Sequence, residues 1–145
     1  MTKKDLADLM YPNVTLTIED LEKKYPKRDL PEGAIVSRYA PSPTGFVHMG
    51  NMLSCFIESF LPLKTNGVFY LRIEDTDQKR EVEGGITNII NSIKSLGINY
   101  NEGVISETEQ HGEYGPYIQS ERRDIYDVFA KYMIENDMAY PCFCT

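Results

Sequence analysis

The chain has 145 residues, of which 41% are hydrophobic and 26% are charged, and it contains no tryptophan. This length suits one ordinary domain with a core, and the composition is that of a soluble globular protein rather than a disordered one. The start lacks the apolar run of a secretion signal and no later stretch is long enough to cross a bilayer, so we expect a cytoplasmic protein.

The formal net charge of −7 is unevenly distributed along the chain. Residues 81–145 carry eleven acidic and four basic side chains, whereas residues 38–80 carry four and five. The net charge therefore argues only weakly against a nucleic-acid partner. Three cysteines cannot all pair, and Cys55 lies in an apolar pattern, which favours reduced thiols.

Residues 1–34 are predicted to form a separate helical extension. Thr17 is placed to cap a short amphipathic helix, with Asp20 three residues later and Pro26 as the stop. The turn-forming sequence RDLPEG then separates this extension from the rest of the chain.

Strand and helix patterns alternate after the extension. Residues 34–40 and 67–74 are predicted strands, and residues 51–63 and 84–97 are predicted helices. In the first helix, Met52, Cys55, Phe56, Ser59 and Phe60 share a helical spacing, and Pro62 is expected to bend or end it. The second helix has one apolar stripe, and Gly97 is its expected stop; the stripe consists of Ile86, Ile89, Ile90, Ile93 and Leu96. This order predicts an α/β fold with a parallel sheet and right-handed crossovers.

The last third of the sequence is less regular. Residues 99–117 are rich in glycine and acids and are predicted to form an irregular connection. Ser120 is the expected N-cap of a helix that runs to about Asn136. No closing element follows, so we expect the chain to be the first part of a longer catalytic domain.

The turn after the first strand, YAPSPTGFVHMGN at residues 39–51, contains the main candidate site. Ligands of doubly wound sheets bind where a strand's carboxyl end meets the next helix, whose first N–H groups suit phosphate. Gly50 allows close approach of backbone to a ligand, and His48 can donate a hydrogen bond to a phosphate oxygen. A lone loop histidine is more often simply solvated, but the order of strand, turn, His-x-Gly and helix favours a nucleotide site.

These residues resemble the class I aminoacyl-tRNA synthetases, in particular the bacterial-type glutamyl-tRNA synthetase branch. The family's His-Ile-Gly-His motif corresponds to His48-Met49-Gly50-Asn51, preceded by RYAPSPTG. Further matching blocks are LRIEDTD at 71–77, LGINYNEG at 96–103, GPYIQSER at 115–122 and AYPCFCT at 139–145. The resemblance covers residues 35–145 and implies the first, incomplete half of a Rossmann-type nucleotide-binding catalytic domain.

The resemblance also implies roles for the residues of the turn. His48, Gly50 and Asn51 would be catalytic, and Thr44 would join them in binding ATP. Asn51 departs from the family's second histidine, although its amide can still donate a hydrogen bond.

Amino-acid recognition is carried over onto Arg38, Ala40, Ser42 and Glu74. An arginine fork suits a carboxylate of glutamate, and a carboxylate suits its ammonium group. On charge alone, Arg38 and Glu74 would instead be read as a strand-end ion pair and a solvated loop acid.

Two further sets of residues follow from the resemblance. Thr76 and Asp77 are candidate contacts of the tRNA 3′ end, although acids in a short turn are more often solvated. Cys142 and Cys144 correspond to half of a zinc site found in some members, the alternative being free thiols.

The implied activity is that of a glutamate–tRNA ligase, which activates glutamate with ATP and transfers it to tRNA(Glu). The implied cofactor is ATP with Mg²⁺, zinc is left open, no membrane partner is expected, and the whole protein is expected to be monomeric and cytoplasmic. The lysine-rich second signature of the family is missing from these residues, so we expect them alone to be inactive. The alternatives are a glutamyl-queuosine tRNA(Asp) synthetase-like paralogue, a nucleotidyltransferase with a His-x-Gly-His-type turn, and a non-catalytic nucleotide-binding module.

Overall fold

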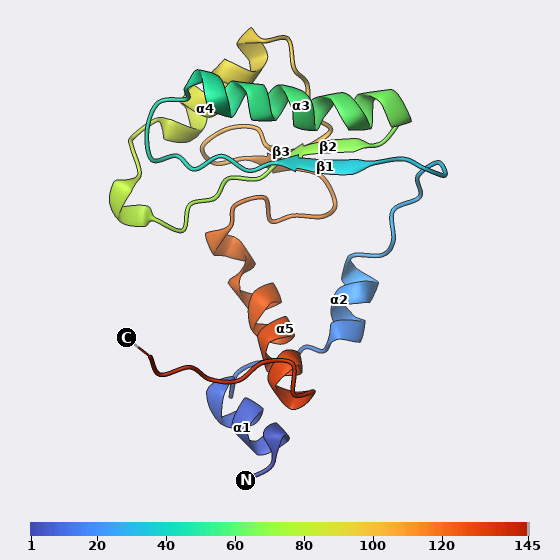
Figure 1. Ribbon diagram of the computed structural model, residues 1–145, viewed down its shortest axis with the longest axis vertical. Helices are drawn as coiled ribbons and strands as arrows, with labels where there is room; N and C mark the ends of the chain where they lie inside the picture. The colour runs from blue at the N-terminus through green and yellow to red at the C-terminus, as the bar shows by residue number, and fades with distance from the viewer. Residues whose placement is uncertain (145) are drawn as a thin grey trace. The chain divides into compact units, whose positions relative to one another are not determined.

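The computed structural model describes residues 1–144, which form two compact units (Figure 1). One unit is Arg28–Glu121, and the other combines Met1–Lys27 with the segment from Arg122 onward. These units do not coincide with the predicted extension, 1–34, and the predicted catalytic segment, 35–145, which stay predictions.

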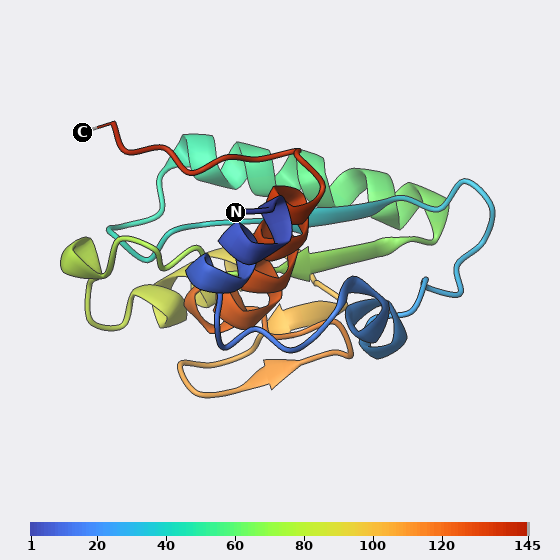
Figure 2. The same ribbon diagram turned by 90° about the horizontal axis from the view of Figure 1, so that it is seen from below.

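A four-stranded sheet forms the centre of the larger unit. Its strands are β1 (Val36–Tyr39), β2 (Val68–Leu71), β3 (Glu102–Val104) and β4 (Gln110–His111), in that spatial order. The pairs β1–β2 and β2–β3 are parallel and β3–β4 is antiparallel, so β4 lies at an edge (Figure 2). The predicted parallel α/β sheet is confirmed.

Helices α3 (Met49–Thr65) and α4 (Gly85–Ser95) lie together on one side of the sheet (Figure 1). Alternation along each strand turns every second side chain toward these helices. Tyr39 of β1 and Leu71 of β2 are register partners on this helix-facing side. The core is made of these and nine further buried residues: Cys55, Phe69, Ile73, Ile89, Ile90, Ile93, Ile98, Val104 and Tyr117.

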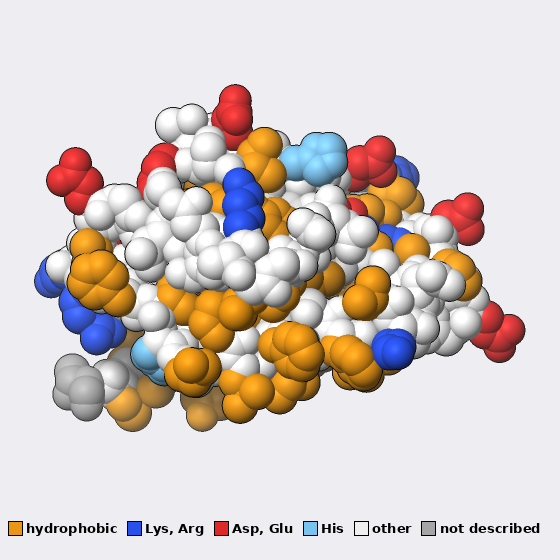
Figure 3. Space-filling model, turned by 90° about the horizontal axis from the view of Figure 1, so that it is seen from above, with side chains coloured by type: hydrophobic (Ala, Val, Ile, Leu, Met, Phe, Trp, Pro, Cys, Tyr) orange, Lys and Arg blue, Asp and Glu red, His pale blue; other side chains and the backbone are white. Residues whose placement is uncertain are grey.

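The helix ends agree with the sequence in part. Gly97 has a left-handed φ of +69° just after α4, as a C-terminal stop requires. Pro62 does not end α3, which continues to Thr65 and stops at left-handed Asn66. Of the predicted stripe on α3, Cys55 is buried whereas Phe56 and Phe60 are exposed, because the outer part of this helix has no covering element in the described chain. Hydrophobic side chains accordingly gather on this side of the molecule (Figure 3).

Two predictions for the last third are wrong. The connection expected to be irregular contains β3 and β4, which are too short to give an alternating pattern. Ser120 is not the cap of the last helix, α5 (Arg123–Glu135), which begins after a 3₁₀ turn and has Arg122 at its N-cap. Ser120 instead donates hydrogen bonds to Asp75 through its backbone N–H, at 2.8 Å, and its hydroxyl.

The smaller unit consists of helices α1 (Lys3–Met10), α2 (Ile18–Lys24) and α5. The predicted cap of α2 is confirmed, since Thr17 and Asp20 form a reciprocal capping box. Lys131 of α5 bonds to Asp8 of α1 at 2.8 Å, and hydrogen bonds from Lys131 and Lys4 lower the pKa of Asp8 to about 2. No helix within residues 1–144 combines the length and apolar character needed to cross a membrane.

An ion pair fastens the start of the larger unit to β3. The Arg28 guanidinium bonds to both carboxylate oxygens of Glu102, at 2.5 and 2.6 Å, and lies 3.7 Å from the centre of the Tyr114 ring. The Tyr117 hydroxyl donates to the same carboxylate at 2.7 Å. The Arg28 hydrogen bonds hold the pKa of Glu102 below its ordinary value of 4.5.

Replacing Gly103 by alanine should weaken the sheet. Gly103 has a φ of +135°, and a Cβ there would lie 2.3 Å from the Leu71 carbonyl oxygen. We expect Gly103→Ala to lower the free energy of unfolding by about 1–3 kcal/mol in denaturant titrations. Gly45→Ala is the control, because a Cβ at that position meets no atom within 4 Å. Equal losses for the two variants would contradict this account of β3.

The Glu102 ion pair should give stability that depends on pH. Because the folded pKa lies below the ordinary 4.5, this contribution is present above pH 4.5 and is lost as the pH falls through the folded value. We expect the difference in unfolding free energy between the unchanged protein and Glu102→Gln to shrink below pH 4.5. A difference that stays constant with pH would contradict the lowered pKa.

Candidate active site

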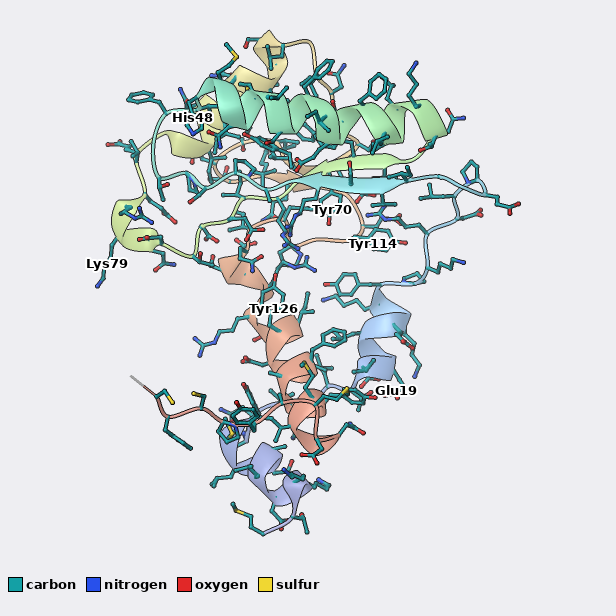
Figure 4. All side chains as sticks on the ribbon, viewed as in Figure 1. Glu19, His48, Tyr70, Lys79, Tyr114 and Tyr126 are labelled. Carbon is teal, nitrogen blue, oxygen red and sulfur yellow. The ribbon has the colours of Figure 1, made fainter. Side chains whose placement is uncertain are left out.

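The loop between β1 and α3 lies at the carboxyl edge of the parallel strands. His48 is the N-cap residue of α3, with extended backbone angles, and its side chain makes no capping hydrogen bond. Figure 4 shows His48 at the first turn of this helix. The exposed imidazole is therefore available beside N–H groups that helix geometry leaves without intrahelical partners.

The side chain of His48 folds back over Gly50. A Cβ at residue 50 would lie 3.3 Å from both Cε1 and Nδ1 of the imidazole, which is closer than ordinary van der Waals contact. Glycine thus allows the ring to rest against the first turn of α3. The spacing His-x-Gly has a steric reason in this chain.

A cleft of about 290 Å³ opens at this turn. It brings together four of the residues predicted from the sequence: Ser42, Thr44, His48 and Asn51. The rest of its lining comes from the same loop, from β1 and from α4: Tyr39, Pro41, Gly45, Phe46, Val47 and Ile89. Of these, Ile89 was predicted only as part of the apolar stripe of its helix, because sequence spacing does not show that α4 reaches the cleft.

Backbone hydrogen bonds hold the loop in place. The Pro41 carbonyl accepts from the Glu74 N–H at 2.9 Å, and the Pro43 carbonyl accepts from the Val82 N–H at 3.0 Å. A Cβ at Gly85 would lie 2.8 Å from the Pro43 carbonyl oxygen, so α4 begins in close contact with the loop. The loop that lines the cleft is therefore fixed by backbone hydrogen bonds and by its contact with α4.

Arg38 and Glu74 are brought together by the register of β1 and β2. Arg38 pairs with Tyr70, and Glu74 follows two alternations later, so both side chains lie on the sheet face away from α3. Arg38 Nη1 is 3.3 Å from Glu74 Oε1. Ala40, which follows β1, is half-buried between Arg38 and the loop.

Arg72 is a site neighbour that the sequence reasoning missed. Its Nε and Nη2 donate to Glu74 Oε1 at 3.2 and 3.0 Å. The signal was available, because residues two apart on a strand share a face and LRIEDTD places an arginine two residues before Glu74.

Buried polar groups lie on the opposite face of the sheet, under α3. Burial raises the pKa of Tyr39 and of Cys55 to about 12, and it raises the pKa of Glu58, which Arg38 opposes. Within residues 1–144, Glu58 Oε2 and the Tyr39 hydroxyl are buried without a hydrogen-bond partner. The Cys55 thiol therefore stays protonated at neutral pH, which is expected of a packing residue rather than a nucleophile.

The acidic block after Glu74 divides into different environments. Asp75 is buried and bonded to Ser120, which joins the LRIEDTD and GPYIQSER blocks. Thr76 is exposed, and Asp77 accepts from Arg80 Nε at 2.6 Å. Thr76 and Asp77 are outside the lining of the cleft.

The possible half zinc site lies in the other compact unit. Cys142 and Cys144 are exposed free thiols, and the Cys144 N–H lowers the pKa of Cys142. Two thiols supply only half of a tetrahedral zinc site. Residues 1–144 contain no group of three or more His, Cys, Asp or Glu placed to hold a metal ion.

Known proteins with similar sequences include glutamate–tRNA ligases. The ligase of Clostridium perfringens (strain 13 / Type A) is 50% identical over 145 residues, which is all of this chain and 27% of the relative. The ligase of Clostridium beijerinckii is 52% identical over 145 residues, all of this chain and 26% of the relative. The chain thus spans about a quarter of the length of the curated relatives it matches.

Solved structures show a similar fold. A glutamate tRNA ligase from Elizabethkingia meningosepticum, crystallised in complex with its amino acid, has a TM-score of 0.63 and 37% identity, covering 71% of this chain and 20% of that one. The glutamate-tRNA synthetase from Elizabethkingia anophelis has a TM-score of 0.64 and 36% identity, covering 70% and 20%.

The family itself is described as tRNA synthetases class I (E and Q), catalytic domain, and it matches residues 34–145. This range is nearly the one expected from the motifs, and it confirms the resemblance. With its half Rossmann sheet and its His-x-Gly turn, the chain belongs to the class I tRNA synthetases for glutamate and glutamine, within their catalytic domain.

Proposed function

We propose that the chain supplies the ATP and amino-acid sites of a glutamate–tRNA ligase, which forms glutamyl-adenylate and transfers the glutamyl group to tRNA(Glu). The observation that supports this most is the hydrogen bond of 2.9 Å between the Glu74 N–H and the Pro41 carbonyl. It fixes the Arg38–Glu74 pair next to the loop that lines the His48 cleft. An amino acid and a nucleotide can therefore be held side by side.

Activation is an attack of a glutamate carboxylate oxygen on the α-phosphorus of ATP, with pyrophosphate as the leaving group. Negative charge increases on the phosphate oxygens, so donors placed beforehand lower the barrier. His48 and the first N–H groups of α3 would be such donors, and Gly50 keeps the approach to them open. Asn51 and Thr44 would bind ATP from the cleft wall, and Mg²⁺ would enter bound to ATP as part of the substrate.

Amino-acid recognition would use the other part of the site. Glutamate carries two carboxylates and one ammonium group, for which Arg38 and Glu74 are the matching partners. Arg38 would bind the side-chain carboxylate, whose charge distinguishes glutamate from glutamine. Ala40 leaves room for the substrate, and the Ser42 hydroxyl would donate to it from the cleft.

The tRNA part of the reaction would use residues outside the lining of the cleft. Thr76 and Asp77 would contact the 3′ end of tRNA(Glu), and they follow Glu74 directly. ATP–pyrophosphate exchange that depends on glutamate, followed by formation of glutamyl-tRNA(Glu), tests the proposed reaction in the full-length ligase that contains this segment. Glutamylation of a base in tRNA(Asp) would favour the paralogue, and exchange without glutamate would favour a nucleotidyltransferase.

His48→Ala should slow adenylate formation strongly. Loss of one transition-state donor typically costs about 10²- to 10³-fold in rate. We expect this loss in the exchange rate of the full-length ligase, with little change in the KM for glutamate. His111→Ala is the matched control, because His111 lies on β4 outside the cleft lining. A His48 variant with an ordinary exchange rate would rule out this role.

Arg38→Ala should weaken glutamate binding selectively. Removing one partner of a charge-assisted hydrogen bond costs about 2–3 kcal/mol, which corresponds to roughly 30- to 150-fold in KM. We expect the KM for glutamate to rise by this factor while the KM for ATP changes little. Equal effects on both substrates would contradict the assignment of Arg38.

A further inference from the structure

The hydrogen-bond ladder between β1 and β2 continues beyond the two strands. The Arg72 N–H donates to the Tyr39 carbonyl at 3.0 Å, and the Glu74 N–H donates to the Pro41 carbonyl. The alternation of an extended chain then places Tyr70, Arg72 and Glu74 on one face. Figure 4 shows Tyr70 on the side of the sheet opposite α3.

The two arginines contact Glu74 in different ways. Arg72 donates from Nε and Nη2 to Oε1 at 3.2 and 3.0 Å, whereas Arg38 reaches the same oxygen at 3.3 Å. The Arg72 side chain is 15% exposed and the Arg38 side chain 37%. Arg72 is therefore the more firmly enclosed partner, and Arg38 is the more accessible one.

We propose that Arg72 is a positioning residue for amino-acid binding, which holds Glu74 by Oε1 so that Oε2 receives the substrate ammonium group. This inference rests on the proposed function and deepens it. Glu74 Oε2 accepts no hydrogen bond from any residue in the described range 1–144. One oxygen is thus bound to the protein and the other is left for a ligand.

Charge balance explains why a second arginine is needed. Glu74 together with Arg38 and Arg72 carries a net charge of +1, which suits an amino acid with two carboxylates and one ammonium group. When Arg38 turns to the substrate carboxylate, Glu74 loses one partner while its side chain is only 25% exposed. An unpaired carboxylate at that burial is costly, and Arg72 keeps it paired. Arg38 can then bind the substrate without leaving the Glu74 carboxylate unpaired.

The test compares glutamate with glutarate, the dicarboxylate that lacks the ammonium group, in the full-length ligase with tRNA(Glu) present. For Arg72→Gln we expect the KM for glutamate to rise by about tenfold or more, while inhibition by glutarate and the KM for ATP change less than about twofold. Arg38→Ala should weaken glutamate and glutarate alike. Equal weakening of both ligands by Arg72→Gln, or no change in either, would overturn the proposal.

Two further variants separate orientation from charge and from folding. Arg72→Lys keeps the charge but not the planar pair of donors, so it should behave like Arg72→Gln; full activity would overturn the orienting role. If Arg72→Gln does not fold, Arg72→Lys alone tests whether Arg72 orients Glu74. Arg28→Gln, which breaks the other partly buried Arg–Glu pair, should lower thermal stability without changing the KM for glutamate. Failure of the proposed function would look different, since the unaltered ligase would then show no glutamate-dependent exchange.

Discussion

The parallel pairing of β1 with β2 is the constraint on which the candidate site depends. Val36–Tyr39 aligns with Val68–Leu71, and the same ladder continues as hydrogen bonds from Arg72 and Glu74 to the carbonyls of Tyr39 and Pro41. Two segments more than thirty residues apart in sequence are thereby fixed at one edge. A slip by one residue would turn Arg38 toward α3 and Tyr39 away from the core. The core and the candidate site thus depend on the same register.

The sequence predicted those parts of the fold that depend on local pattern. The Thr17 capping box, the apolar stripe of α4 and its Gly97 stop follow from side chains a few residues apart. The cap and the stop are confirmed, and the stripe is confirmed for Ile89, Ile90 and Ile93, whereas Leu96 is half exposed. Ser120 shows where this reasoning fails. A serine before a helix is a good local cap, but the buried Asp75 carboxylate, 45 residues earlier, takes its hydroxyl. Nothing in the neighbouring residues indicates that competition.

The residues of the candidate site can likewise be divided into those that a local pattern predicts and those that it does not. Ser42, Thr44, His48 and Asn51 belong to one turn, so a motif could predict that they lie together. Ile89 reaches the cleft only through the packing of α4 against the loop, which no local pattern contains. Arg72 lies between these two cases, because strand alternation puts it on the face of Glu74 but does not show that the two side chains bond. Pro62 and the exposed Phe56 show a related limit of prediction from sequence. Whether an apolar side chain is covered depends on elements that a spacing pattern does not contain.

The charge around the candidate site at the edge of the sheet differs from the net charge of the whole chain. The formal net charge is −7, yet both proposed substrates, ATP and glutamate, are anions. At physiological ionic strength the Debye length is about 8 Å, so exposed charges farther than this from the site are largely screened from it. The groups next to the site are instead the N-terminus of α3 and the cluster of Arg38, Arg72 and Glu74, whose net charge is +1. A net charge summed over the chain therefore says little about what this site binds, because charges close to the site act on a ligand more strongly than screened ones.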